Sequence, residues 1–252
     1  MNLWSAFKKE VLEQARTKKL LIAVILLAAF GMLSPLMAKL IPDIFASIPS
    51  LASYSSLIPP PTVNDAVAQY VKNLTQFGVL LALLFSMGAV AQEKDKGTAA
   101  MVLSKPMPRS SFLIAKFMAV SLTLAIAMAA AAIGGYYYTY FLFEPLKATA
   151  FLEMNGLLLL YMLVYAAVTL FFSSLTRTQF VAIGGAAGVL IVFNILAALP
   201  NLGKYAPEAM ISNAIALMLG QPISNWWGLW VGLITIGVAL AGAWLVFRRQ
   251  EL

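Results

Sequence analysis

The residues of this chain best suited to chemistry form a short polar stretch, Gln-Glu-Lys-Asp-Lys-Gly-Thr, which runs from Gln92 to Thr98. A second stretch, Leu-Ser-Lys-Pro-Met-Pro-Arg, follows and ends at Arg109, and long apolar runs flank the pair. Charged side chains are costly in hydrocarbon, so these stretches must lie outside a membrane core. They are also too short to build a hydrophobic core of their own. Their chemistry is therefore ion pairing and recognition, and we expect a cytoplasmic partner to bind them.

Other kinds of chemistry have little support in the composition. The chain has no Cys and no His, which excludes disulfides and thiol chemistry and leaves no zinc or haem site of the usual kind. Its 12 Met residues are scattered without a repeated Met-x-x-Met cluster, so Cu(I) binding is not expected. It also lacks the Gly-x-x-x-x-Gly-Lys-Ser/Thr loop that cradles nucleotide phosphates. We therefore expect no catalytic, cofactor or metal site in this chain.

The elements that position the polar stretches are membrane spans. Apolar residues make up 62% of the chain and charged residues 11%, whereas soluble domains are about one quarter charged. A helix that crosses the hydrocarbon needs roughly 20 mostly apolar residues. This rule predicts an all-α integral membrane protein with one transmembrane domain over residues 1–252. The six predicted spans are approximately Leu20–Leu40, Leu74–Ala91, Phe112–Phe141, Leu152–Phe172, Phe180–Leu199 and Trp226–Phe247.

Lysine and arginine residues predict the orientation of these spans. If both termini lie on one side, that side holds most of the 17 Lys and Arg residues. Cytoplasmic loops carry the excess of Lys and Arg, so both termini are expected in the cytoplasm. The same asymmetry accounts for the net charge of +7 without a nucleic acid partner. The basic residues expected on the other side are Lys39, Lys72, Lys147 and Lys204.

Residues 1–19 are predicted to form an amphipathic helix in the membrane interface. Apolar residues such as Trp4 and Leu12 share one face, whereas Lys9 and Glu10 fall on the largely charged opposite face. An equally good interpretation is a positively charged anchor that only fixes the topology.

Residues 92–111 form the loop between the second and third spans. Gly97 should break the helix before it, and Thr98 can cap a short helix that extends to about Leu103. The apolar side chains of Met101 and Leu103 have no local surface to pack on, which favours a groove on a partner protein. The alternative is an ordinary solvated loop.

Two connections on the other side are more than turns. In residues 41–73, Asn64 could cap a helix that starts at Asp65 and runs unbroken into the second span. In residues 200–225, the apolar piece Pro207–Leu219 is too short to span and too apolar for water. It predicts a re-entrant or interface-lying helix.

The loop after the second span also has a recognisable pattern. An acidic-basic-x-x-Gly-Thr sequence, then Leu-Ser-x-Pro, then Arg and a further Lys, resembles the membrane subunit of type-2 ABC transporters, the ABC-2 permease family. The interface helix, the six spans and the short helix before the sixth also match, so the resemblance covers essentially the whole chain. The residues that carry the pattern are Glu93, Lys94, Gly97, Thr98, Leu103, Ser104, Pro106, Arg109 and Lys116.

The resemblance implies an exporter permease in a prokaryotic plasma membrane. It implies a homodimer, or a heterodimer with a similar permease, bound to two ATP-binding-cassette subunits that hold ATP and Mg. In that family the loop helix after the second span passes the movement of the ATPase to the membrane helices. The residues expected to couple to the ATPase are Glu93, Lys94, Gly97, Thr98, Met101, Leu103, Pro106 and Arg109.

Small and polar residues inside the spans are weaker signals. Gly184 and Gly188 form a Gly-x-x-x-Gly pair, which could be a dimer or gate contact, or could serve packing within one subunit. Asn194 is a candidate pathway residue, although an interhelical hydrogen bond explains it about as well. Lys116 and Glu153 lie near span ends and are expected to reach the interface.

Two other classes of function remain open. A stand-alone secondary transporter or channel usually carries membrane-embedded carboxylates, histidines or broken helices, and no midplane acid is obvious in this chain. A membrane-embedded enzyme would need paired acids, a metal site or a nucleophile–base pair at one depth, and the sequence favours none of these.

Overall fold

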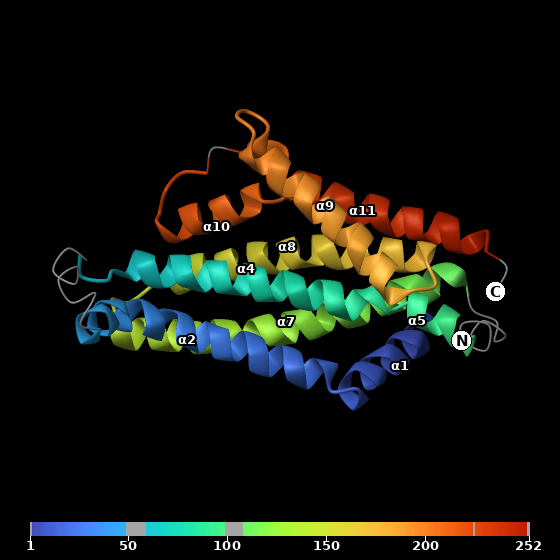
Figure 1. The fold of residues 1–252 in the computed structure, drawn as a ribbon, viewed down its shortest axis with the longest axis horizontal. Coiled ribbons are helices and arrows are strands. Elements are labelled where there is room, and N and C mark those ends of the chain that lie inside the picture. The colour runs from blue at the N-terminus through green and yellow to red at the C-terminus, as the bar shows by residue number, and fades with distance from the viewer. Residues whose placement is uncertain (1, 49–58, 99–107, 224, 251–252) are drawn as a thin grey trace.

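A computed structural model describes residues 2–48, 59–98, 108–223 and 225–250 as a bundle of helices that run roughly along one direction (Figure 1). Within these residues every regular element is helical, and six helices are long and apolar enough to cross a membrane. The predicted all-α fold with six spans is therefore confirmed. The elements are α1 (Leu3–Arg16), α2 (Lys19–Ser47), α4 (Val63–Met87), α5 (Ala91–Asp95), α7 (Arg109–Leu142), α8 (Ala148–Leu175), α9 (Gln179–Ala198), a 3₁₀ turn η1 (Gly203–Tyr205), α10 (Ala209–Met218) and α11 (Trp227–Arg248).

The first two spans are longer than predicted. Helix α2 continues past Pro42 to Ser47, and α4 runs unbroken from the connection of residues 41–73 into the second span, as expected. The predicted cap is wrong, because Thr62 rather than Asn64 begins this helix. The Thr62 hydroxyl accepts from the Asp65 N–H at 3.4 Å, and the Asp65 carboxylate accepts from the Thr62 N–H at 2.8 Å. This reciprocal capping box satisfies two backbone donors, which a single Asn cap would not do.

The core of the bundle lies between α4 and α8, which are the most deeply buried spans. The buried Tyr70 hydroxyl on α4 donates to Oδ1 of Asn155 on α8 at 2.6 Å, and Nδ2 of Asn155 donates to the Phe151 carbonyl at 2.8 Å. Hydrogen bonds of this kind let a buried amide remain inside a span. By contrast, α9 and α11 bury only a small share of their residues within the described chain.

Helices α2 and α7 pack closely at glycine residues. A Cβ atom added to Gly31 of α2 would lie 2.5 Å from the carbonyl oxygen of Ala131 on α7. One added to Gly134 of α7 would lie 2.7 Å from Cγ of Met32 on α2. Small residues allow such close approach of helix backbones. We call this contact the α2–α7 seam.

A short helix lies where the piece Pro207–Leu219 predicted one. Helix α10 covers Ala209–Met218 and ends before Gly220, whose φ is +64°. It packs against α8, and Gly228 and Gly232 of α11 fit closely against it. The second glycine pair of the chain therefore serves packing within the subunit.

The second span ends in a break that α8 supports. Between α4 and α5 the helix is interrupted over residues 88–90, which frees backbone groups inside the bundle. Ser173 of α8 binds them: its hydroxyl accepts from the N–H groups of Val90 and Ala91, both at 3.0 Å, and donates to the Met87 carbonyl at 2.8 Å. Backbone groups freed within a membrane protein need internal partners of this kind. The break lets α5 leave the axis of α4 toward the site described next.

Candidate functional site

Lys116 of α7 is the centre of a buried ion-pair cluster. Its side chain is 3% exposed, and Nζ lies 2.7 Å from Oε1 of Glu93 on α5 and 3.1 Å from both carboxylate oxygens of Glu10 on α1. The expectation that Lys116 reaches the interface is wrong, because two carboxylates pair with its ammonium group where it lies. We call Lys116, Glu10 and Glu93 the Lys116 cluster. It joins the N-terminal helix and the loop after the second span to the third span.

Helix α1 packs on α7 through residues of its charged face. Glu10 and Gln14 are buried, and Oε1 of Gln14 accepts from the Thr123 hydroxyl at 3.3 Å. Trp4 and Leu12 are more than half exposed. The charged face therefore turns toward α7, where the buried Lys116 pairs with Glu10. The apolar face points away from the bundle, as it would on a helix that lies in a membrane interface.

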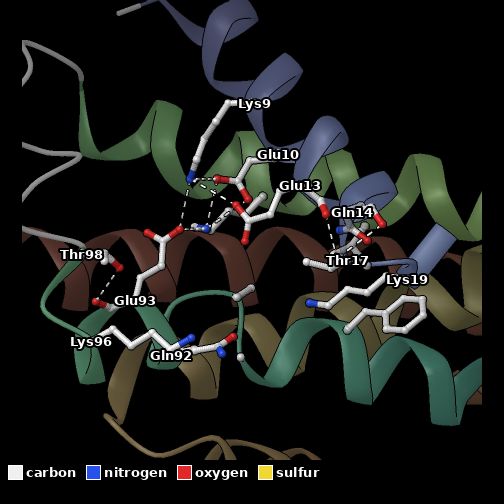
Figure 2. A pocket seen from close by; sticks show the side chains of 15 residues that line it. Lys9, Glu10, Glu13, Gln14, Thr17, Lys19, Gln92, Glu93, Lys96 and Thr98 are labelled. Carbon is white, nitrogen blue, oxygen red and sulfur yellow. Dashed lines mark hydrogen bonds and ion pairs between the residues drawn. The ribbon is translucent and has the colours of Figure 1, made fainter.

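Lys9 extends the cluster toward the surface. Its Nζ lies 3.0 Å from Glu10, 3.4 Å from Glu13 and 3.3 Å from Glu93, as Figure 2 shows for Glu10 and Glu93. Burial alone would raise the pKa of Glu10, but the ammonium groups of Lys116 and Lys9 hold this pKa below its ordinary value. Burial alone would lower the pKa of Lys9, but Glu10 and Glu93 hold it above its ordinary value. Both side chains are therefore charged at neutral pH.

The three carboxylates do not fit a metal site. Glu10, Glu13 and Glu93 each place an oxygen within 4.8 Å of the others. However, the Lys9 ammonium group already contacts all three, and Lys116 contacts two of them. A divalent cation would have to displace these positive charges, so the donor set is one of compensated ion pairs.

A cavity of about 610 Å³ adjoins the Lys116 cluster between α1, α4, α5, α7 and the start of α2 (Figure 2). We call it the charged cavity. Its wall combines charged and amide side chains with apolar ones. The residues that line it are Lys9, Glu10, Glu13, Gln14, Thr17, Lys19, Phe85, Gly88, Ala89, Gln92, Glu93, Lys96, Thr98, Lys116 and Val120.

Two further residues of the sequence pattern bind helix ends. Nζ of Lys94 donates to the Ser174 carbonyl, near the end of α8. Arg109 donates from one guanidinium nitrogen to the carbonyls of Phe247, Arg248 and Gln250, at 2.8, 3.0 and 2.9 Å, where α11 ends. Cations at helix C-termini satisfy carbonyls that have no partner within the helix. Both residues thus anchor the loop to the bundle.

The middle of the predicted loop is described only in part. Gly97 follows the C-cap residue of α5, Lys96, and has a φ of +68°, so the expected break is present. The Thr98 hydroxyl donates to the Glu93 carbonyl at 3.3 Å. Met101, Leu103 and Pro106 lie outside the described residues.

The small and polar residues predicted in the fifth span lie on an exposed face. Cβ atoms added to Gly184 or Gly188 would meet nothing within 4 Å, so this pair does not pack within the described part of the subunit. Asn194 is also exposed, and its Nδ2 donates to the Leu190 carbonyl of the same helix at 2.8 Å. The structure therefore does not bring these residues into contact with the Lys116 cluster.

An acidic residue that sequence reasoning missed lies between α8 and α10. Oε1 of Glu208 accepts from the hydroxyls of Tyr165 at 2.7 Å and Tyr161 at 3.4 Å. Its other oxygen is buried and has no hydrogen-bond partner among the described residues. Glu208 stands in a connection rather than a span, so a search for acids within spans passes over it. The two tyrosines one helical turn apart were the available signal.

Comparisons with known proteins cover the whole of this arrangement. Residues 4–252 match the model of a family described as "ABC-2 family transporter protein". The chain is also similar to an uncharacterized transmembrane protein, YxlG, of Bacillus subtilis (strain 168). The two are 24% identical over 256 residues, which include 99% of this chain and 98% of that relative.

Proposed function

Because the chain belongs to the ABC-2 transporter family, we propose that it is the permease subunit of an ATP-binding-cassette exporter. ABC-2 permeases lie in a membrane and generally work with an ATPase subunit, and they are not themselves catalytic. This chain has no phosphate-cradling loop of its own. ATP and Mg would therefore bind to a separate polypeptide, in two copies, and its hydrolysis would drive a substrate across the membrane.

The Lys116 cluster is the observation that carries this proposal. Through it, Glu93 at the start of the predicted ATPase-binding loop is bound to the third span, and Glu10 binds the N-terminal helix to the same lysine. Pulling on the loop would therefore pull on α7 and α1 together. A buried ion pair resists separation, because each charge left alone in the interior is strongly destabilised.

The anchors of the loop support the same role. Lys94 binds the end of α8 and Arg109 binds the end of α11. Movement at Gly97, Thr98 and residues 99–107 would reach these spans as well. We infer that Met101, Leu103 and Pro106 contact the ATPase.

We propose that the α1 end of the bundle faces the cytoplasm of a prokaryotic cell. Helix α1, α5 and the last turn of α11 lie together at this end (Figure 1). The excess of Lys and Arg on this side favours the cytoplasm by the positive-inside rule. An ATPase would be available only there.

A second permease copy would cover the exposed fifth span. Gly184 and Gly188 leave open space on α9, and α9 buries little of its surface within the subunit. A partner helix could approach closely at this stripe. Cargo would then pass between two permeases, with Asn194 as a candidate contact.

Purification of the tagged chain from its host in mild detergent, followed by mass spectrometry, tests the proposal. We expect a stoichiometric partner that carries a phosphate-loop ATPase sequence. Recovery of the chain alone, or only as a self-oligomer even after gentle cross-linking, would contradict the proposal. Gradient-driven flux into liposomes that contain only this chain would then favour a stand-alone transporter.

A second experiment tests coupling in the assembled complex. Lys116→Met should reduce transport per ATP hydrolysed while the ATPase still co-purifies, because the loop would no longer be bound to α7. Lys8→Met is the matched control, since Lys8 is exposed on the same interface helix and makes no ion pair in the described chain. Equal transport by the two variants would overturn the assigned role of the cluster.

A further inference from the structure

Two lysines of the charged cavity take no part in the Lys116 cluster. Within the part of the chain that the structure describes, neither Lys19 nor Lys96 pairs with a carboxylate. Lys19 is only partly exposed, and its Nζ lies 6.0 Å from the centre of the Phe85 ring. The carboxylates of Glu10 and Glu13 line the same cavity but are paired with Lys9 and, for Glu10, with Lys116. They compensate the partly buried charge of Lys19 only in part, so a further anion would be favoured there.

The two lysines face each other across the cavity. In Figure 2 the ammonium group of Lys19 points into the cavity from the α2 side. The ammonium group of Lys96 and the side-chain amide of Gln92 point into it from the α5 side. Three nitrogen donors from two elements thus border one space. Such an arrangement suits an anion with several oxygen atoms, such as a phosphate group.

The shape and lining of the cavity point to a larger ligand than free phosphate. Its volume of about 610 Å³ exceeds what one phosphate group fills, and Phe85 and Val120 add apolar surface to the wall. A phosphate joined to an apolar chain would use both parts of this lining.

The cavity also lies where lipid headgroups are found. Lys19 is the first residue of the first span, so the cavity borders the end of the hydrocarbon-crossing segment. The exposed Trp4 and Leu12 place α1 in the same interface layer. Arg16 and Lys18 are exposed nearby and would attract anionic lipids.

We propose that the charged cavity binds the phosphate headgroup of an anionic phospholipid, with Lys19 and Lys96 as its cationic contacts and Gln92 as a hydrogen-bond donor. The bound headgroup would bridge α2 and α5, beside the Lys116 cluster. The lipid composition of the membrane would thereby affect the position of α5, the helix that leads into the predicted ATPase-binding loop. The site goes beyond the proposed transport function and needs no ATPase, although its assignment to the cytoplasmic leaflet rests on the proposed orientation.

Lipid titration of the purified full chain in detergent tests the proposal. The probes are dioleoyl phosphatidylglycerol, dioleoyl phosphatidylcholine with the same acyl chains, and inorganic phosphate, each followed by the thermal stability of the protein. A ligand that binds the folded state raises its melting temperature in a concentration-dependent way. We expect phosphatidylglycerol to stabilise the chain at concentrations at least about tenfold lower than either other probe.

Four variants separate this site from general attraction to charge. Lys19→Gln and Lys96→Gln should each weaken phosphatidylglycerol binding about five- to tenfold, whereas Lys8→Gln, an equal charge change outside the cavity, should leave it within about twofold. Lys96 is exposed, so its variant tests the site even if Lys19→Gln folds poorly. Lys19→Arg should retain binding.

Several outcomes would overturn the proposal. Equal stabilisation by phosphatidylglycerol and phosphatidylcholine would mean that the site does not distinguish an anionic headgroup from a neutral one. Equal stabilisation by inorganic phosphate would assign the cavity to a free anion. Equal weakening by Lys8→Gln and the two cavity variants would reduce the effect to surface charge. None of these results bears on whether an ATPase co-purifies, so the two proposals fail separately.

Discussion

Replacing Lys116 with Met should be among the most destabilising single changes at the α1 end of the bundle. Met has a similar length but removes the charge that faces Glu10 and Glu93, whose side chains are 11% and 13% exposed. Removing one partner of a buried ion pair typically costs about 3–5 kcal/mol. Lys9 remains 3.0 Å and 3.3 Å from the two carboxylates, so the lower end of that range, about 3 kcal/mol, is expected.

Two variants of α1 calibrate this value. Glu10→Gln leaves Lys116 paired with Glu93 at 2.7 Å, so a loss of about 1.5–3 kcal/mol is expected. Glu13→Gln is the matched control, because Glu13 is half exposed and pairs only with Lys9, one turn away, at 3.4 Å. Such pairs contribute less than about 0.5 kcal/mol.

Unfolding in mixed micelles by SDS titration, followed by tryptophan fluorescence, measures these differences. The double variant Glu10→Gln with Lys116→Met should lose less than the sum of the single losses, because it leaves one orphan carboxylate fewer. A Lys116→Met loss no larger than that of Glu13→Gln would refute the reasoning, and so would strict additivity of the double variant.

The same unfolding assay checks three further expectations. Ser173→Ala removes the partner of two N–H groups and one carbonyl at the α4–α5 break, so the free energy of unfolding should fall by about 1–3 kcal/mol. Ser174→Ala is the control, because it removes only a hydrogen bond within its own helix. Equal losses of stability in the two variants would contradict the role assigned to Ser173. Gly31→Ala should cost about 1–3 kcal/mol through overpacking of the α2–α7 seam, whereas Gly237→Ala, which faces open space, should be neutral or stabilising. The pKa of Glu10 is lowered by folding, so its contribution is present above the ordinary value of 4.5 and is lost as pH falls through the lower folded value. The contribution of Glu10 to the free energy of unfolding should therefore be constant between pH 6 and 8. Glu10→Gln should reduce the stability that the protein loses on acidification, and an unchanged acid profile would count against the ion pair of Glu10 with Lys116.

The sequence predicts the spans well because their physics is local. Twenty apolar residues in a row must cross hydrocarbon, whatever lies beside them. The same holds for α10, where a short apolar run ends at Gly220, and for the break at Gly97. Each of these signals resides within one segment of the chain.

The Lys116 cluster could not be predicted in this way. Its partners lie 106 and 23 residues away in the sequence, and the composition of α7 says nothing about which carboxylates reach it. The side of the N-terminal helix that meets the bundle could not be predicted for a related reason. In a soluble protein the apolar face of a helix is buried against the core. On α1 the apolar face with Trp4 points outward and the polar face with Glu10 packs inward, because the surroundings of a membrane protein are themselves apolar.

The α2–α7 seam has a mechanical consequence. A backbone contact as close as that of Gly31 with Ala131 leaves no room for one helix to slide past the other, so the two can tilt only as one rod. The 34 residues of α7 make this rod about 50 Å long, and a tilt of about 10° about one end displaces the far end by about 9 Å. Lys116 lies close to the N-terminal end of α7, at the α1 end of the bundle, where Glu10 and Glu93 would apply the force. In the proposed transport cycle, a small displacement of Lys116 would therefore become a displacement of several ångströms at the opposite end of α7.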